Sequence, residues 1–380
     1  MASCKLKISG LGKRYGDFVA LAPTDLEVAE GEFLTLLGPS GSGKTTLLNL
    51  IAGLSVPDDG KLLIEGRDAT WQPPYERDIG MVFQNYALFP HMTIEDNIAF
   101  PLQMRKLKPA AARERARQAL DTVRLPQVAQ RYPKELSGGQ QQRIALARCL
   151  VYKPSIILMD EPLGALDKKL RDQMQLEIKR IHRELGTTIV YVTHDQEEAM
   201  TMSDRICLME GGRIAQLGTP ADLYFRPRSL FVADFLGESN LLEGRVATSG
   251  GDAVQVTLAA GGRPVGARSN GHQAFAAGQP VRVMVRPQNL GLGAADHAHD
   301  GTHDGPRDGE GDGGTLQGTV LDRMISGSLT KLYVQRAGAA ADDAPLVAAY
   351  PTARPRERHE IGETVTLHWR RADAVVVPAA

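Results

Sequence analysis

Residues 38–45 constrain the fold of this chain more than any other stretch. They read Gly38-Pro39-Ser40-Gly41-Ser42-Gly43-Lys44-Thr45 and fit the pattern G-x-x-x-x-G-K-[ST]. An apolar run, 33–37, precedes them, and a helical stretch from about 44 to 52 comes directly after. Glycines here let backbone N–H groups close around a phosphate, which the positive end of the helix also faces. A glycine turn can arise as plain structure, but the full pattern after an apolar strand predicts a phosphate-binding α/β fold.

Four apolar runs in the first 236 residues end in residues that could do chemistry. The chain alternates such runs with helical stretches, the pattern of a parallel sheet with crossover helices. Run 33–37 leads into the glycine-rich loop, 79–83 into Gln84, 155–159 into Asp160 and Glu161, and 188–193 into His194. Because ligands bind beyond the carboxyl ends of strands in open α/β sheets, we expect these endings to converge on one edge.

The residue types at these endings suit the hydrolysis of a nucleoside triphosphate. Lys44 would reach the β- and γ-phosphates, and the Thr45 hydroxyl would bind Mg²⁺. An unpaired carboxylate at the end of a buried strand costs free energy, and a bound divalent cation would remove that cost. Asp160 is therefore predicted to hold Mg²⁺ and its ligand shell. Glu161 presents a second carboxylate, which can act as general base on water. The sequence Asp-Glu-Pro at 160–162 could instead have only a structural role, as the cap of a turn. The phosphate loop upstream favours the catalytic interpretation.

Size and composition limit the alternatives. The chain has 380 residues, which favours two domains or more, and a formal net charge of −1, which argues against nucleic acid as the main partner. Cys4, Cys149 and Cys207 have no metal-like spacing, and we expect free thiols in a reducing cytoplasm. The N-terminus has no signal-peptide pattern, and no run of about eighteen apolar residues suggests a membrane span. We expect a soluble cytoplasmic chain.

The pattern of residue types along the chain changes at two places. Residues 88–150 read as a mostly helical subdomain inserted into the α/β core, and residues 1–236 as one nucleotide-binding domain. From 237 to 380, alternating valines with frequent glycine predict a small all-β, barrel-like domain. The polar segment 291–314 interrupts it and is expected to be a flexible loop. Its histidines could bind a metal, although solvated disorder explains the composition more simply: His297, His299 and His303.

One further motif lies between the phosphate loop and the carboxylate pair. The segment Leu136-Ser137-Gly138-Gly139-Gln140-Gln141-Gln142-Arg143 resembles the signature motif of ATP-binding cassette (ABC) ATPases. Five other motifs stand in that family's order across residues 5–236. The resemblance implies ATP and Mg²⁺ as cofactors, with the nucleotide held by Tyr15, Gly38, Pro39, Ser40, Gly41, Ser42, Gly43, Lys44, Thr45 and Thr46.

The resemblance also assigns roles outside the phosphate loop. Gln84 would be the Q-loop glutamine that senses Mg²⁺ and the γ-phosphate, and His194 the switch histidine that contacts the γ-phosphate and the water. Asp167 falls at the D-loop aspartate, where Gly164 stands in place of the serine often found. The signature residues would cap the ATP of a second copy of the chain, so the enzyme would be a homodimer: Ser137, Gly138, Gly139 and Gln140.

Within the family, the chain is similar to importer ATPases that are separate polypeptides. Residues 76–91 are typical of them, and the stretch after Gln84 would dock a membrane permease. Residues around 285–287 and 318–320 resemble an OB-like TOBE domain. Gln288 stands where glutamate is often found. The resemblance implies a peripheral protein on the cytoplasmic face of the bacterial inner membrane, with an indirect solute-binding-protein partner. The solute implied is a polyamine, with sugar, iron(III), sulfate or phosphonate as alternatives. An exporter ATPase, or a non-transport ATPase of translation or repair, fits less well.

Overall fold

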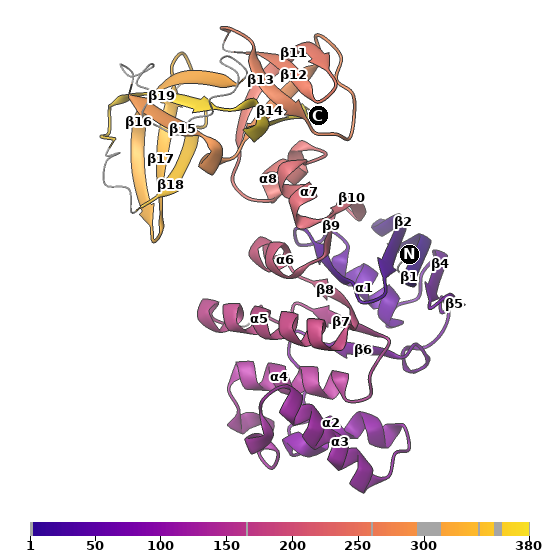
Figure 1. Cartoon of the computed structure of the whole chain (residues 1–380). Coiled ribbons are helices and arrows are strands. Elements are labelled where there is room, and N and C mark those ends of the chain that lie inside the picture. The colour runs from indigo at the N-terminus through magenta and orange to yellow at the C-terminus, as the bar shows by residue number, and fades with distance from the viewer. Residues whose placement is uncertain are drawn as a thin grey trace. The chain divides into compact units, whose positions relative to one another are not determined.

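The computed structural model describes residues 3–164, 166–259, 261–294, 313–340, 343–352 and 359–379. The chain forms two compact units, Met1–Pro220 and Ala221–Ala380, and each has its own hydrophobic core. Figure 1 shows the first unit in indigo to magenta and the second in orange to yellow. The predicted histidine-containing part of the loop, 295–312, lies outside the described residues.

The first unit is built on a six-stranded sheet and a separate four-stranded sheet. Its strands are β1 (Cys4–Tyr15), β2 (Phe18–Ala29), β3 (Phe33–Leu37), β4 (Asp59–Ile64), β5 (Arg67–Asp68), β6 (Ile79–Val82), β7 (Ile156–Asp160), β8 (Thr188–Val192), β9 (Arg205–Glu210) and β10 (Arg213–Gly218). Its helices are α1 (Lys44–Ala52), α2 (Ile94–Met104), α3 (Pro109–Thr122), α4 (Gly138–Leu150), α5 (Lys168–Leu185), α6 (Gln196–Met202) and the start of α7 (Pro220–Phe225).

The larger sheet has the order β10-β9-β3-β8-β7-β6, and all neighbours except β10 and β9 are parallel. Both faces of this sheet are covered, which explains the nearly continuous apolar runs in the sequence. Alternate residues of β3 show it: Phe33 belongs to the core shared with α2 to α5, whereas Leu34 and Leu36 belong to the core shared with α1 and β1. The parallel α/β fold predicted from the sequence is therefore confirmed.

The smaller sheet was not expected from the sequence. It has the order β2-β1-β4-β5 and is antiparallel. Its long strands β1 and β2 alternate buried and exposed residues along much of their length, the pattern of a sheet that buries one face. The buried side chains Leu6, Ile8 and Leu26 join the core around α1.

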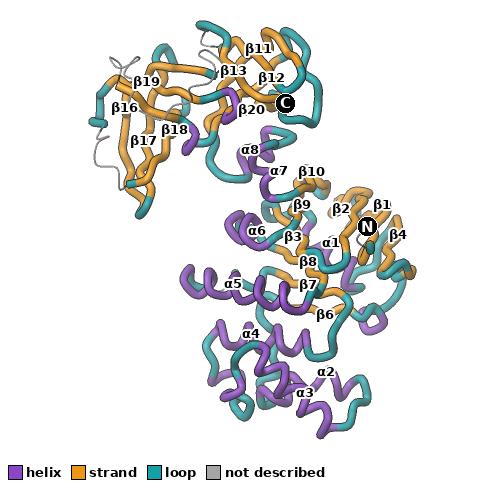
Figure 2. The backbone as a smooth tube through the Cα atoms, in the orientation of Figure 1, coloured by secondary structure: helices purple, strands orange, loops and turns teal. Residues whose placement is uncertain are grey.

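The predicted helical subdomain corresponds to α2, α3 and α4, which pack on one another and form one group in Figures 1 and 2. Ala112, Ala116 and Leu120 repeat at helical spacing and are the buried side chains of α3. Pro101 lies inside α2, and the helix ends at Met104. Apart from this stripe, most residues of α3 are exposed to solvent.

The second unit is mostly β-structure. Its helices are α7 and α8 (Leu230–Phe235), and its strands are β11 (Asn240–Gly250), β12 (Ala253–Leu258), β13 (Val265–Ser269), β14 (Pro280–Val285), β15 (Gly291–Ala294), β16 (Gly314–Ser326), β17 (Leu329–Arg336), β18 (Leu346–Pro351), β19 (Thr364–Trp369) and β20 (Ala374–Pro378). Five strands close a barrel, β11-β12-β13-β20-β14. The other five form a sheet of order β15-β19-β16-β17-β18.

The structure differs from the sequence prediction at both ends of segment 291–314. Gly291–Ala294 forms β15 and pairs with β19, and Gly314 begins β16, which also pairs with β19. Leu292 packs against the core of the unit, and the burial of this side chain explains why the strand extends into a segment of polar composition. The barrel was predicted, but the additional sheet was not.

Candidate functional site

The four predicted strand endings lie on neighbouring strands of the larger sheet. In the order β3-β8-β7-β6, the carboxyl ends of these strands lead into the phosphate loop, His194, Asp160 with Glu161, and Gln84 respectively. Because the strands are parallel, these endings lie at the same edge. The topology therefore brings together segments that are up to about 150 residues apart in sequence.

The phosphate loop has the backbone geometry that its glycines permit. Gly38, Gly41 and Gly43 have φ angles of 149°, 78° and 100°, which L-residues with a side chain rarely adopt. A Cβ on Gly38 would overlap the carbonyl oxygen of Met209, and one on Gly43 would lie 2.8 Å from the Ala20 carbonyl oxygen. The loop is thus held tightly against its surroundings, and its shape depends on glycine.

Lys44 begins α1 and turns back into the loop. Its Nζ donates hydrogen bonds to the carbonyl oxygens of Gly38 and Pro39, both at 2.8 Å. Burial lowers the pKa of the Lys44 ammonium, and the nearby charges of Glu161 and Asp160 oppose that effect. The ammonium is therefore held inside the curve of the loop, close to the two carboxylates. Thr45, next in the chain, is exposed.

Asp160 ends β7 and Glu161 follows it, so that two carboxylates are adjacent in the chain. Burial, followed by the charge of Glu161, raises the pKa of the Asp160 carboxyl, and Lys44 partly offsets this. Glu161 adopts a φ of 43°, an unusual conformation for a residue other than glycine. Its amide donates to the carbonyl of Val192 on β8, at 3.0 Å, and so ties the turn after β7 to the strand that leads to His194.

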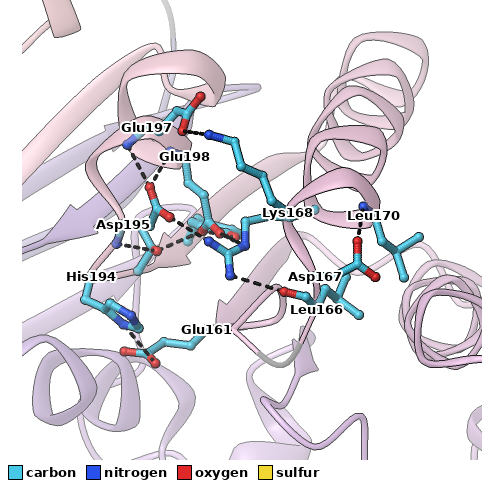
Figure 3. Close-up of polar contacts among 12 residues, drawn as sticks. Glu161, Leu166, Asp167, Lys168, Leu170, His194, Asp195, Glu197 and Glu198 are labelled. Atoms are coloured by element: carbon cyan, nitrogen blue, oxygen red, sulfur yellow. Dashed lines mark hydrogen bonds and ion pairs between the residues drawn. The ribbon is translucent and has the colours of Figure 1, made fainter. Parts of the chain in front are cut away.

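Glu161 and His194 face each other (Figure 3). The Glu161 Oε2 and His194 Nδ1 atoms are 3.2 Å apart, and the His194 side chain is 61% exposed. Gln84 is exposed and also lies near this turn, because a Cβ built on Gly164 would be 3.8 Å from Gln84 Nε2. The structure thus brings Lys44, Asp160, Glu161, His194 and Gln84 to one place.

The predicted signature residues lie elsewhere in the first unit, at the start of α4. Ser137 is the N-cap residue and forms a capping box with Gln140: the Ser137 amide donates to Gln140 Oε1 at 3.0 Å, and the Gln140 amide donates to Ser137 Oγ at 3.4 Å. Ser137 and Gly138 are exposed. A Cβ on Gly139 would lie 2.8 Å from the Leu170 side chain, so that glycine permits close packing of α4 on α5.

The two remaining predicted residues have clear local positions. Asp167 is the N-cap of α5, and its side chain accepts a hydrogen bond from the Leu170 amide at 2.9 Å. Tyr15 ends β1 and is 54% exposed. Lys13 Nζ lies 5.4 Å from the centre of the Tyr15 ring, within cation–π distance. Tyr15 therefore lies at the surface next to a turn.

Two arginines near the site were missed by the sequence reasoning. Arg148, in the last turn of α4, donates to the carbonyl oxygens of Tyr86 and Ala87, both at 2.8 Å. Tyr86 and Ala87 have positive φ angles of 60° and 48°. Arg148 therefore fixes the backbone after Gln84. Arg171, in α5, bonds Asp195 next to His194. A motif scan finds neither arginine, because each acts on backbone or side chains distant in sequence.

A groove of about 460 Å³ opens near this part of the first unit. Residues from three segments line it, including Tyr75, Met81, Met104, Arg105, Arg148 and Tyr152. Tyr75 is 82% exposed and Met104 is 64% exposed. Exposed apolar side chains of this size around a concavity are typical of a surface that binds another protein.

The sequence matches two family models, which cover different parts of the chain. The model of the ABC transporter matches residues 21–164, and the model of the TOBE domain matches residues 283–377. The spermidine/putrescine import ATP-binding protein PotA of Methylococcus capsulatus is 44% identical over 97% of this chain and 91% of its own length. The chain belongs to the ABC transporter family.

Other cassettes agree with this assignment. The protein of the same name from Bacillus cereus is 40% identical over 98% of both chains. Among solved structures, CbiO1 of Clostridium perfringens, described as part of the ABC transporter complex CbiONQ, has a TM-score of 0.55 at 28% identity, and covers 58% of this chain and 90% of its own. A dimeric cassette bound to ADP and Pi has a TM-score of 0.51 at 35% identity, over 57% of this chain and 98% of its own.

As a member of this family, the cassette hydrolyses ATP with Mg²⁺, as the sequence predicted. The residues at the sheet edge fit that chemistry, since they offer a glycine loop for phosphates, a lysine, a hydroxyl and two carboxylates. Among the described residues, no group of three or more His, Cys, Asp or Glu side chains could hold a metal ion. Within those same residues, no helix is long and apolar enough to cross a membrane.

Proposed function

We propose that the chain is the ATP-hydrolysing subunit of a bacterial importer of spermidine and putrescine. The observation that carries the hydrolytic role is the pairing of Glu161 with His194 beside the phosphate loop. Sequence similarity supports the assignment of the solute, since relatives that are 40–48% identical bear the name of spermidine/putrescine import proteins. The cassette acts as a homodimer on the cytoplasmic face of the plasma membrane, together with a separate permease and, through it, a solute-binding protein.

The phosphate loop holds the nucleotide. Its N–H groups and the N-terminus of α1 face the phosphates, and Lys44 leaves its two carbonyl partners to contact the β- and γ-phosphates. Thr45, Asp160 and Gln84 would hold Mg²⁺, directly or through water, and the bound ion would neutralise charge on the phosphate oxygens. Ion binding also removes the cost of burying the Asp160 carboxylate, which its raised pKa reflects.

Glu161 acts as general base on the water that attacks the γ-phosphate, and His194 positions that water and the phosphate. The 3.2 Å contact between the two side chains supports this division of roles. The Glu161 carboxylate points toward His194 (Figure 3), from a backbone with a φ of 43°. A residue held in such a conformation by its neighbours is a common feature of catalytic sites.

The dimer is inferred from where the signature residues lie. Ser137, Gly138, Gly139 and Gln140 start α4, apart from the cluster at the strand ends. In the proposed assembly they cap the ATP of the second copy, where the positive end of α4 faces phosphate. Tyr15 stacks on adenine, for which its exposed ring is suited. Asp167 caps α5 at the end of the turn that begins at Glu161.

The groove lined by Tyr75, Met104 and Arg148 is the proposed docking site for a permease helix. Its wall includes Arg148, which fixes the backbone of Tyr86 and Ala87 two and three residues after Gln84. A helix pressed into this groove would bear on that segment and so on the Mg²⁺ ligand. This coupling makes hydrolysis respond to the permease.

Glu161→Gln tests the hydrolytic assignment. The amide has no base function, so the rate of ATP hydrolysis should fall by about 10²- to 10⁴-fold, while ATP affinity stays near the wild-type value. Because ATP then persists, the variant should accumulate as an ATP-bound dimer. Steady-state hydrolysis and size-exclusion chromatography with ATP measure both effects. A variant that hydrolyses ATP at the wild-type rate would contradict the role of Glu161.

Stimulation of the ATPase in proteoliposomes tests the solute. The cassette would be reconstituted with the permease and binding protein encoded beside it, and spermidine and putrescine would be compared with maltose, iron(III), sulfate and a phosphonate. Stimulation by a polyamine alone supports the proposal. Stimulation by another solute would identify that solute as the substrate and leave the ATPase mechanism intact. No stimulation by any solute would favour a role outside transport.

A further inference from the structure

A polar network connects the starts of α5 and α6 next to the Glu161–His194 pair (Figure 3). Its centre is Arg171, one turn into α5 after the cap residue Asp167. The side chain of Arg171 is 28% exposed and reaches across to Asp195, the residue after His194. None of the roles proposed above involves Arg171.

The guanidinium of Arg171 contacts two segments that are about 30 residues apart. Nη1 donates to Asp195 Oδ2 at 2.9 Å, and Nη2 donates to the carbonyl oxygen of Leu166 at 3.2 Å. The planar fork of arginine lets one side chain fix both acceptors in a defined relation. A lysine at the same place has a single nitrogen and cannot reproduce that geometry.

Each contacted segment leads directly to one member of the pair. Leu166 ends the turn that begins at Glu161, in which the Gly164 amide donates to the Glu161 carbonyl at 3.2 Å and the Leu166 amide to the Leu163 carbonyl at 3.1 Å. Asp195 comes directly after His194 in the chain and caps α6 through hydrogen bonds from the amides of residues 197 and 198. Arg171 therefore holds both the Glu161 turn and the His194 segment.

Buried side chains near the start of α6 and on β8 also belong to this network. Glu198 is 3% exposed, and its Oε2 accepts hydrogen bonds from the hydroxyls of Tyr191, at 2.7 Å, and Thr193, at 2.8 Å. Its Oε1 lies 3.7 Å from Arg171 Nε, which is buried and has no hydrogen-bond partner among the described residues. The charge of Arg171 thus faces a fixed carboxylate, which restrains the guanidinium and leaves its two Nη groups to Asp195 and Leu166.

We propose that Arg171 is a positioning residue for ATP hydrolysis, which sets His194 against Glu161 by holding the Leu166 carbonyl and Asp195 together. This inference rests on the roles proposed above for Glu161 and His194. Arg171 touches neither the nucleotide nor the reacting atoms, and it lies outside the groups expected to bind phosphate. Its loss should therefore slow hydrolysis without weakening ATP binding.

Arg171→Lys tests the proposal in the full-length cassette. Misplacement of catalytic groups by about 1 Å can cost up to about 100-fold in rate, so we expect kcat to fall by about 10- to 100-fold. The KM for ATP and the Kd for a fluorescent ATP analogue should stay within about twofold of wild type. A variant with wild-type kcat, or one in which kcat and affinity fall together with the unfolding midpoint, would overturn the positioning role.

Lys168→Met is the matched control. Lys168 also connects α5 with α6, through a 3.5 Å contact with Glu197, but both side chains are more than 60% exposed and neither reaches Asp195 or Leu166. Exposed pairs of this kind contribute little, so kcat should stay near wild type. A loss equal to that of Arg171→Lys would show that any link between the two helices suffices, and would overturn the specific assignment.

A double-mutant cycle with Asp195→Asn locates the effect. Asparagine keeps the cap of α6 but loses the charge that pairs with Arg171. If the pair acts as a unit, the double variant should be no slower than the slower single variant. Strictly additive losses would overturn the pairing.

If Glu161→Gln retains hydrolysis, the proposed function fails. If Glu161→Gln is inactive and Arg171→Lys behaves as wild type, only this inference fails.

Discussion

At the scale of single residues, the phosphate loop shows how one residue type serves two different physical needs. Gly38 and Gly41 both have positive φ angles. Gly38 is also enclosed, because a Cβ there would overlap the Met209 carbonyl, whereas no atom lies within 4 Å of a Cβ on Gly41. Backbone strain alone therefore penalises a side chain at Gly41, while strain and steric overlap act together at Gly38.

Alanine at these two glycines should have unequal effects. A strained backbone position costs about 1–3 kcal/mol, so Gly41→Ala should weaken ATP binding by about tenfold. Gly38→Ala must in addition move the loop away from β9, and we expect a loss of ATP affinity of about 100-fold or more. Titration with a fluorescent ATP analogue measures both. Equal losses would contradict the distinction drawn from the Met209 carbonyl.

At the scale of elements, a buried acid helps to hold the short helix α6 in place. Glu198 anchors this seven-residue helix to β8 through the Tyr191 hydroxyl and through Thr193. Burial raises the pKa of the Glu198 carboxyl, and the nearby charge of Asp195 adds to that effect; the hydroxyl hydrogen bonds and Arg171 oppose it. The position of the helix thus depends on a group whose charged form is disfavoured by its surroundings.

The stability conferred by Glu198 should therefore fall as pH rises. In the unfolded chain the carboxyl loses its proton near pH 4.5, whereas in the folded chain its pKa is higher. Between those two values the folded state binds the additional proton, so the free energy of unfolding declines with increasing pH. Urea unfolding from pH 4 to pH 8 should show wild type losing stability relative to Glu198→Gln through that window.

The exposed neighbour Glu197 supplies the control for this measurement. Glu197→Gln changes the same helix at a side chain that is 65% exposed, so its stability difference from wild type should vary little with pH. If Glu198→Gln gave an equally flat difference, burial of Glu198 would not be the cause of the pH dependence.

At the scale of the whole molecule, the chain consists of two units with separate cores. In the second unit, Arg286 of the segment after β14 is 1% exposed and stacks on Tyr224 at 4.1 Å. Its Nη groups donate to the side chain of Ser239 and to backbone carbonyls of α7, α8 and the segment after α8. Burial lowers the pKa of Arg286. This one side chain joins α7 and α8 to the barrel.

Arg286→Met should destabilise the second unit alone. The substitution removes a charged donor that bonds the Ser239 hydroxyl and four backbone carbonyls, and each such bond contributes about 1.5–3 kcal/mol, so we expect a total loss of about 3 kcal/mol or more. Differential scanning calorimetry of the full chain should show the transition of the second unit moving to lower temperature while that of the first stays in place. Equal shifts in both transitions would contradict independent cores.

How far prediction from sequence succeeded depended on whether the signal was local. The strand-loop-helix around Lys44 and the carboxylates at the end of β7 are contiguous patterns, and the four strand endings on one sheet edge result from parallel topology. The antiparallel sheet of β1, β2, β4 and β5 was not predicted, because β1 pairs with β4, which is distant in the sequence, and this pairing leaves no local pattern. The second sheet of the C-terminal unit was missed because β15 lies within a polar segment.

By itself, the sequence determined the family, the parallel α/β core, the all-β second unit and the strand endings that carry the candidate site, because these rest on short motifs and periodicity. Only the tertiary structure decided that Glu161 Oε2 lies 3.2 Å from His194 Nδ1 and that Arg171 holds the segments leading to both. It also decided that Arg148 fixes the backbone after Gln84 and that Arg286 is buried against carbonyl groups. A side chain that bonds residues distant in the sequence leaves no periodic or local pattern, so its partners are known only once the strands are ordered in space.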